Sequence, residues 1–113
     1  MITPVLKALT VLDGDENWGD TADDFRIMVQ ADIGPKDDKG SETFTFYATS
    51  PKRLESMLYN NEIQIGRGLL IMNDFNVDDI EVVIERLIEN CKRNTWNEVA
   101  LALCRYSYWE YDN

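Results

Sequence analysis

Two neighbouring stretches of the sequence alternate between apolar and polar residues: FRIMVQADI at residues 25–33 and TFTFYAT at residues 43–49. Successive side chains of a strand point to opposite faces, so each stretch predicts a strand with one apolar face. Gly34-Pro35 ends the first stretch, and a polar loop follows from Lys36 to Glu42. Turn-forming residues between two such strands predict a long antiparallel hairpin.

Three further strands are predicted around this hairpin. Residues 2–12 mix β-branched and aliphatic side chains and end at the turn-forming Asp13-Gly14, with Pro4 at a frayed beginning or on a sheet edge. Residues 67–72 contain a brief aliphatic run, and residues 106–111 are rich in aromatic side chains. Length and composition predict a strand for each of these two stretches.

Three helices are predicted from the residues at their starts. Ser50-Pro51 supplies an N-cap hydroxyl and a proline at the first helical position, for a short helix that ends near residues 60–61. A longer helix begins at about Asn76, and Thr95 with Glu98 fits the capping box of a third. The apolar stripes expected to face the core are Ile80, Val83, Ile84, Leu87, Ile88 and Cys91 in the second helix, and Trp96, Val99, Ala100 and Leu103 in the third.

The predicted order of elements is β-β-β-α-β-α-α-β. Strands and helices that do not alternate regularly favour an α+β fold over a doubly wound parallel sheet. We therefore expect an antiparallel or mixed β-sheet with helices packed on one face. A length of 113 residues is close to the commonest domain size, so residues 1–113 are predicted to form a single domain.

The charge of the chain restricts its partners. The sequence has 21 acidic and 11 basic side chains, which give a net charge of −10 at pH 7. Phosphate binding depends on clustered Lys and Arg, so neither a nucleic acid nor a membrane surface is an expected partner. A basic protein is the complementary partner, because an acidic surface speeds its approach. The competing interpretation is that the acidity serves solubility alone.

The lack of a targeting pattern and the low number of cysteines predict a cytoplasmic protein. No apolar run approaches the roughly 20 residues of a membrane span, and Met1–Lys7 lacks the pattern of a signal peptide. Cys91 and Cys104 are too few for a disulfide framework and have no zinc-site spacing. We expect both thiols to be reduced and half-buried.

Catalytic and cofactor motifs are absent from the sequence. The chain has no histidine, no nucleophile elbow and no phosphate-binding glycine loop, so no enzymatic activity and no cofactor are predicted. Asp13, Asp15, Asn17 and Asp24 approximate the ligand spacing of a calcium-binding loop. Because Trp18 occupies the position that requires glycine, an ordinary acidic loop is favoured and no metal is predicted.

The stretch from Asp13 to Asp24 is the predicted partner-binding surface. It holds six acidic residues, no basic residue and one tryptophan, and tryptophan is enriched among interface hot spots. The residues expected to contact the partner are Asp15, Glu16, Trp18, Asp20 and Asp23, together with Asp37 and Asp38 of the hairpin loop, which is expected to be its neighbour. An alternative for Trp18 is that it folds back over the sheet edge. A separate, rival partner-binding site is the last strand, where one aromatic pair is expected to enter the core and Trp109 with Tyr111 to contact the partner.

Six short motifs follow one another along nearly the whole chain. They are IGP at 33–35, SETFTF at 41–46, SP-x-x-L at 50–54, Cys91 followed by TW-x-EVA at 95–100, L-x-R at 103–105 and WEY at 109–111. In this order and spacing the chain resembles the immunity protein 8 family.

The resemblance implies the protective half of a bacterial polymorphic toxin system, in which toxins pass between competing cells in contact-dependent inhibition. Such a protein would bind the C-terminal domain of its cognate toxin in the cytoplasm and block it. The resemblance supplies no catalytic residues. The alternative function is that of an interaction or adaptor module with no toxin partner.

Overall fold

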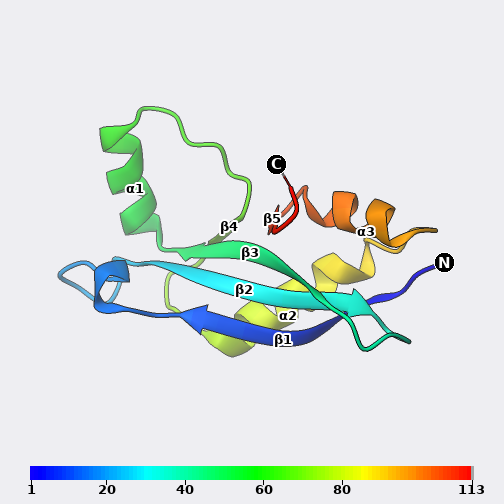
Figure 1. The fold of residues 1–113 in the computed structure, drawn as a ribbon. Helices are drawn as coiled ribbons and strands as arrows, with labels where there is room; N and C mark the ends of the chain where they lie inside the picture. Colours follow the sequence, from blue (N-terminus) through cyan, green and yellow to red (C-terminus); the bar gives the residue numbers. More distant parts are fainter. Residues whose placement is uncertain (113) are drawn as a thin grey trace.

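The computed structural model describes residues 1–112, which form five strands, three α-helices and one short 3-10 helix (Figure 1). In chain order these elements are β1 Pro4–Leu12, η1 Asp15–Asn17, β2 Arg26–Pro35, β3 Glu42–Thr49, α1 Pro51–Asn60, β4 Leu69–Ile71, α2 Val77–Glu89, α3 Trp96–Leu103 and β5 Tyr108–Trp109. The order of strands and α-helices is the predicted one, so the α+β class is confirmed.

The sheet is mixed and is built around β3. Strands β1, β2 and β3 are successive antiparallel neighbours, and Ile27 of β2 faces Ala48 of β3, which confirms the predicted hairpin. The other edge of β3 is shared by two short strands. β4 pairs with it in parallel along Tyr47–Thr49, and β5 pairs antiparallel along Phe44–Thr45.

One face of the sheet carries the core. The apolar residues of β2 and β3 that alternate in the sequence are buried there against α2 and α3. α2 contributes Ile80, Ile84 and Ile88, and α3 contributes Val99 and Leu103. Burying one such aliphatic side chain stabilises the fold by about 1.5–3 kcal/mol. The hairpin and these two helices therefore provide most of the apolar burial.

Side-chain caps fix the start of each α-helix. The side chains of Ser50, Asn76 and Thr95 accept the backbone N–H of the residue three positions later, as the sequence predicted for Ser50 and Thr95. The capping box of α3 is only half formed, because the Glu98 carboxylate accepts the Thr95 hydroxyl at 3.0 Å instead of a backbone N–H. Each cap contributes about 1 kcal/mol.

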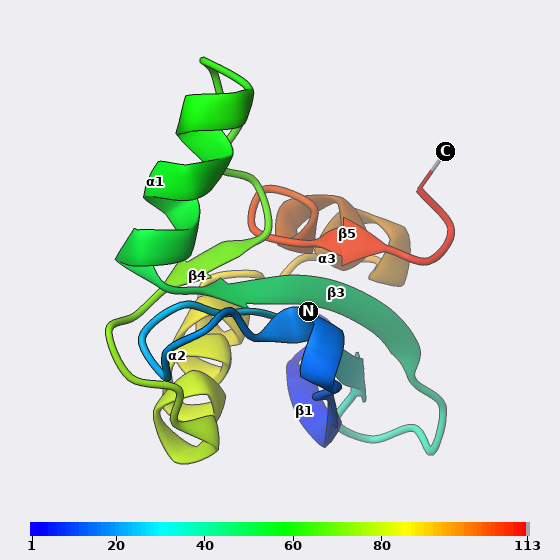
Figure 2. The same cartoon turned by 90° about the vertical axis from the view of Figure 1, so that its left-hand side faces the viewer.

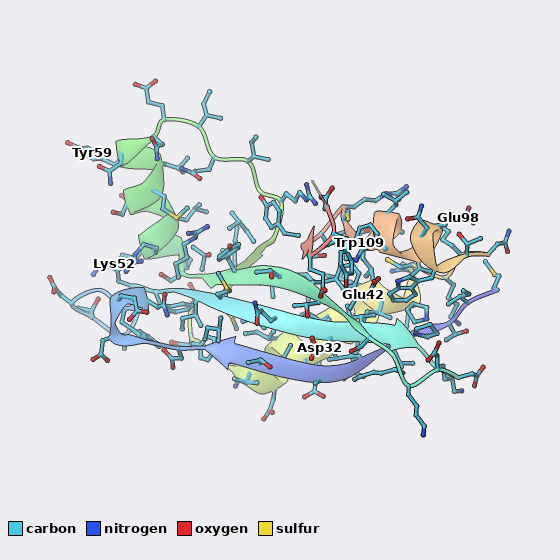
Figure 3. The ribbon with its side chains drawn as sticks, in the orientation of Figure 1. Asp32, Glu42, Lys52, Tyr59, Glu98 and Trp109 are labelled. Atoms are coloured by element: carbon cyan, nitrogen blue, oxygen red, sulfur yellow. The ribbon has the colours of Figure 1, made fainter. Side chains whose placement is uncertain are left out.

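Helix α1 is the exception to the packing of helices on one face. None of its residues is buried. In Figure 2, α1 and α2 extend to opposite sides of β3. Met57 of α1 lies beside Arg26 and Tyr47, on the face of the sheet opposite the core. The outer end of α1, at Tyr59, projects away from the strands (Figure 3).

Two predicted strands are shorter in the structure. The strand predicted at residues 67–72 spans only Leu69–Ile71. The strand predicted at residues 106–111 spans only Tyr108–Trp109, because the turn after α3 continues through Tyr106, whose N–H donates to Leu103. The tyrosine at 106 is therefore outside the sheet.

One residue of the predicted core stripe is also misplaced. Val83 is 39% exposed. It lies about 60° around the axis of α2 from Ile80, on the side away from Ile84, and so at the margin of the buried arc.

Candidate partner-binding surface

The two predicted acidic loops do not form one surface. Residues 13–24 connect β1 to β2, whereas the loop with Asp37 and Asp38 connects β2 to β3. Successive antiparallel connections lie at opposite ends of a sheet, as Figure 1 shows for these two. β2 has 10 residues, and a strand rises about 3.3 Å per residue, so about 30 Å separates the loops. The prediction that they are neighbours is wrong.

The acidic loop at residues 13–24 lies against the start of α1. The Asp24 carboxylate is 2.7 Å from the Arg53 guanidinium, and the Asp23 carboxylate is 3.6 Å from the Lys52 ammonium. A hydrogen bond from the Thr21 hydroxyl, assisted by the Lys52 charge, lowers the pKa of Asp23 below its ordinary value. These contacts tie the second half of the loop to α1.

The remaining predicted acids of this loop are open to a partner. Asp15, Glu16 and Asp20 are exposed, and within residues 1–112 their side chains form no ion pair or hydrogen bond. Such charges attract a basic partner at a distance of about one Debye length, 8–10 Å. Within this loop, these three are the predicted acids that stay exposed and unpaired among residues 1–112.

Trp18 folds back onto the sheet. Its ring centroid is 5.3 Å from that of Phe25 and 6.3 Å from that of Phe75, and its indole N–H donates to Asp13 at 2.5 Å. The residue is half-buried and packs against the core. This is the predicted alternative to a free aromatic anchor, and it leaves only part of the ring to contact a partner.

The alternative aromatic pair is divided between two roles. Trp109 stacks on Phe44, with centroids 6.3 Å apart, and its indole N–H donates to the Glu42 carboxylate at 3.2 Å; Figure 3 labels Trp109 and Glu42. Tyr111 packs edge-on to Trp109 at 5.8 Å and is 59% exposed. Trp109 therefore supports the core, and Tyr111 is the member of the pair that a partner can reach.

A groove that the sequence did not predict lies on the open face of the sheet. Arg26 of β2, Tyr47 of β3, Arg67 and Tyr108 of β5 meet there, with Met57 of α1 at the side. The groove has a volume of about 550 Å³. We call it the Arg–Tyr groove; its remaining lining residues are Asn61, Ile63, Gln64, Ile65 and Leu69.

Arginine and tyrosine side chains stack in pairs inside the Arg–Tyr groove. The guanidinium carbon of Arg26 is 4.3 Å from the Tyr47 ring centroid, and that of Arg67 is 4.5 Å from the Tyr108 centroid. The two tyrosine rings meet edge to face, with centroids 6.3 Å apart. The alternation of β2 and β3 already places Arg26 and Tyr47 on one face. The positions of Arg67 and Tyr108 depend on long-range contacts: β5 pairs with β3, and Arg67 donates to the Ser107 carbonyl next to β5.

The two arginines differ in their partners. Arg67 donates to the Asp112 carboxylate at 2.5 Å and to the Ser107 carbonyl at 3.0 Å, and the Asp112 contact raises the pKa of Arg67. Arg26 forms no ion pair within residues 1–112, and its Nε is buried there without a hydrogen-bond partner. One half-buried guanidinium thus has a cation–π contact and no anion.

Metal-ligating side chains do not cluster within residues 1–112. No group of three or more acidic or cysteine side chains there could hold a metal ion. Burial raises the pKa of both the Cys91 and the Cys104 thiols, which disfavours the reactive thiolate. No helix of that region is long and apolar enough for a bilayer span.

The model of the immunity protein 8 family matches residues 5–113. The chain belongs to the immunity protein 8 family. No curated protein and no solved structure gives a significant match. The family match confirms the resemblance drawn from the six motifs, and it extends through residues 58–68, where those motifs are silent. Membership of this family implies a toxin as the protein partner. The exposed surfaces described above are the candidate contact sites of this immunity protein.

Proposed function

We propose that this immunity protein binds and neutralises one cognate bacterial toxin domain in the cytoplasm of the cell that makes it. The observation that carries the proposal is the family match over residues 5–113. The toxin domain is the C-terminal part of a polymorphic toxin that passes between competing cells. The immunity protein covers its active site or its substrate-binding site, without a catalytic step of its own.

The charge distribution supports a basic toxin surface, such as the substrate cleft of a nuclease. The chain has a net charge of −10, and Asp15, Glu16 and Asp20 stand exposed on one loop. Electrostatic attraction speeds the encounter of such surfaces, which benefits an inhibitor that must act before the toxin does. Occlusion then follows from the bulk of the bound domain.

Rescue of growth tests the proposed function. Cells that express the toxin domain encoded beside this gene should grow when the immunity protein is co-expressed, and they should stop growing when it is not. An unrelated toxin should remain active, because such inhibitors discriminate through a few hot-spot contacts. If every toxin domain encoded nearby remains active, the chain is instead an interaction or adaptor module.

The role of the acidic loop is tested by the rate of association. Replacing Asp15 and Asp20 by Asn and Glu16 by Gln removes exposed charge without touching the contacts of the loop to α1. Association with the toxin domain should slow about tenfold at low salt, and the dependence of the rate on salt should flatten. Stopped-flow fluorescence measures both quantities.

A matched control separates local charge from net charge. Replacing Glu81, Glu85 and Glu89 by Gln changes the net charge by the same amount on the exposed side of α2. This control variant should associate nearly as fast as the wild type. If association slows by the same factor in both variants, only the net charge matters, and the acidic loop is not the toxin-binding surface.

A further inference from the structure

The Arg–Tyr groove has an apolar rim that the fold does not cover. Ile63 and Ile65 of the loop after α1 are 84% and 80% exposed, and both line the groove together with the half-buried Met57. Contiguous apolar side chains at a surface are characteristic of sites that bind another molecule. The floor of the groove, in contrast, is formed by the stacked Arg26–Tyr47 and Arg67–Tyr108 pairs.

The positive charge of Arg26 in the groove has no ion-pair partner in the described part of the chain, residues 1–112. Arg53 and Arg67 are half-buried, as Arg26 is, and each of them contacts a carboxylate. Among residues 1–112, Arg26 alone of these three contacts no carboxylate, although acidic residues outnumber basic ones by 21 to 11 in the sequence. A buried donor without a partner destabilises the folded state, because it has lost its hydrogen bonds to water. An incoming carboxylate supplies the anion that the Arg26 guanidinium lacks among residues 1–112.

We propose that the Arg–Tyr groove binds an Asp or Glu side chain of the toxin domain, presented on a segment with a neighbouring apolar residue. The inference rests on the proposed function, and it identifies the part of the surface that sets the orientation of the toxin domain in the complex. Arginine forks match a carboxylate in geometry and bind it through paired N–H donors. The apolar neighbour of the acid contacts Ile63 and Ile65 on the rim.

A protein carboxylate fits this groove better than a nucleic-acid phosphate. The net charge of −10 opposes the approach of a polyanion, whereas one acidic side chain on a basic protein is not repelled. The aliphatic rim also offers nothing to a sugar–phosphate backbone. Arg26 of the groove begins β2 two residues after Asp24 of the acidic loop, and Met57 of the groove belongs to α1, which that loop contacts, so one toxin domain can contact both.

Binding measured on single variants tests the inference. Arg26→Gln should raise the Kd for the neighbouring toxin domain at least about thirtyfold, because one partner of a desolvated charge pair is lost. Arg86→Gln removes the same charge from the exposed side of α2 and should leave the Kd unchanged. Titration calorimetry gives both values.

Stability distinguishes a binding role of Arg26 from a structural one. The Tm of free Arg26→Gln should stay within about 5 °C of the wild type, because the cation–π contact and the unpartnered Nε have opposite effects. An Ile63→Ser, Ile65→Ser variant, altered only on the exposed rim, should also bind more weakly at an unchanged Tm. Normal affinity in that rim variant contradicts the proposed apolar contact.

Double-mutant cycles identify the acid on the toxin. One Asp→Asn or Glu→Gln substitution in the toxin domain should have no further effect once Arg26→Gln is present, whereas other acids should add independently. If the wild type binds no toxin domain, the proposed function and this inference both fail. If it binds and Arg26→Gln matches Arg86→Gln in affinity, only the groove inference fails.

Discussion

Ser50 connects the start of α1 to the start of β2, and its removal is expected to destabilise the protein more than the loss of an ordinary helix cap. The residue is fully buried. Its hydroxyl oxygen accepts the N–H of Arg53 at 3.2 Å and the N–H of Phe25 at 3.0 Å. Ser50→Ala leaves both donors without this partner, and the donor of Phe25 is inaccessible to water.

The expected magnitude follows from these two donors. Loss of the cap costs about 1 kcal/mol, and a buried unsatisfied N–H costs a further 1–3 kcal/mol, for a total of about 2–4 kcal/mol. Thr95→Ala is the matched control, since Thr95 is an exposed cap with one backbone donor and should cost only about 1 kcal/mol.

Urea unfolding followed by circular dichroism measures the difference. With a slope of about 2 kcal/mol per molar urea, Ser50→Ala should lower the midpoint by about 1–2 M and Thr95→Ala by about 0.5 M. Equal shifts for the two variants would refute the reasoning, because they would mean that the Phe25 N–H finds another partner at no cost.

Two further predictions concern the end of the sheet near β5. The indole N–H groups of Trp96 and Trp109 both donate to the Glu42 carboxylate. Glu42→Ala should therefore lower the free energy of unfolding by about 2 kcal/mol in urea titrations. Glu42→Gln keeps an acceptor oxygen and should lower the free energy of unfolding less. The Thr43 N–H donates to the Glu110 carboxylate and so lowers the pKa of Glu110 in the folded state. The stability that this hydrogen bond contributes is present above the ordinary pKa of glutamate and is lost as the pH falls through the lower pKa of the folded state. The stability difference between wild type and Glu110→Gln should therefore shrink between about pH 5 and pH 3; a difference that stays constant over this range would contradict the assignment.

The candidate surface was only partly predictable. Composition identified Asp15, Glu16 and Asp20 as exposed acids, because a run of acidic side chains cannot enter a core. It could not show that the loop of Asp37 and Asp38 lies at the far end of β2, since that follows from the direction of each strand in the sheet. The two acidic stretches are close in sequence and remote in space.

Local chemistry explains what the sequence alone determined. The alternation in β2 and β3 identifies the buried face of each strand, because one face of a sheet must be apolar to pack. Ser50 and Thr95 mark helix starts, because a side-chain oxygen there satisfies an N–H that has no partner in the helix. Each of these signals depends on residues within a few positions of one another.

Tertiary structure decided the features that depend on distant partners. β4 and β5 share one edge of β3, and this sharing limits the length of both short strands. The same pairing brings Tyr108 beside Tyr47 and completes the Arg–Tyr groove. α1 has the apolar spacing of a core helix, yet it remains on the surface because α2 and α3 already cover the apolar face of the sheet. Periodicity shows which side of a helix is apolar, but only competition for the core determines whether that side is buried.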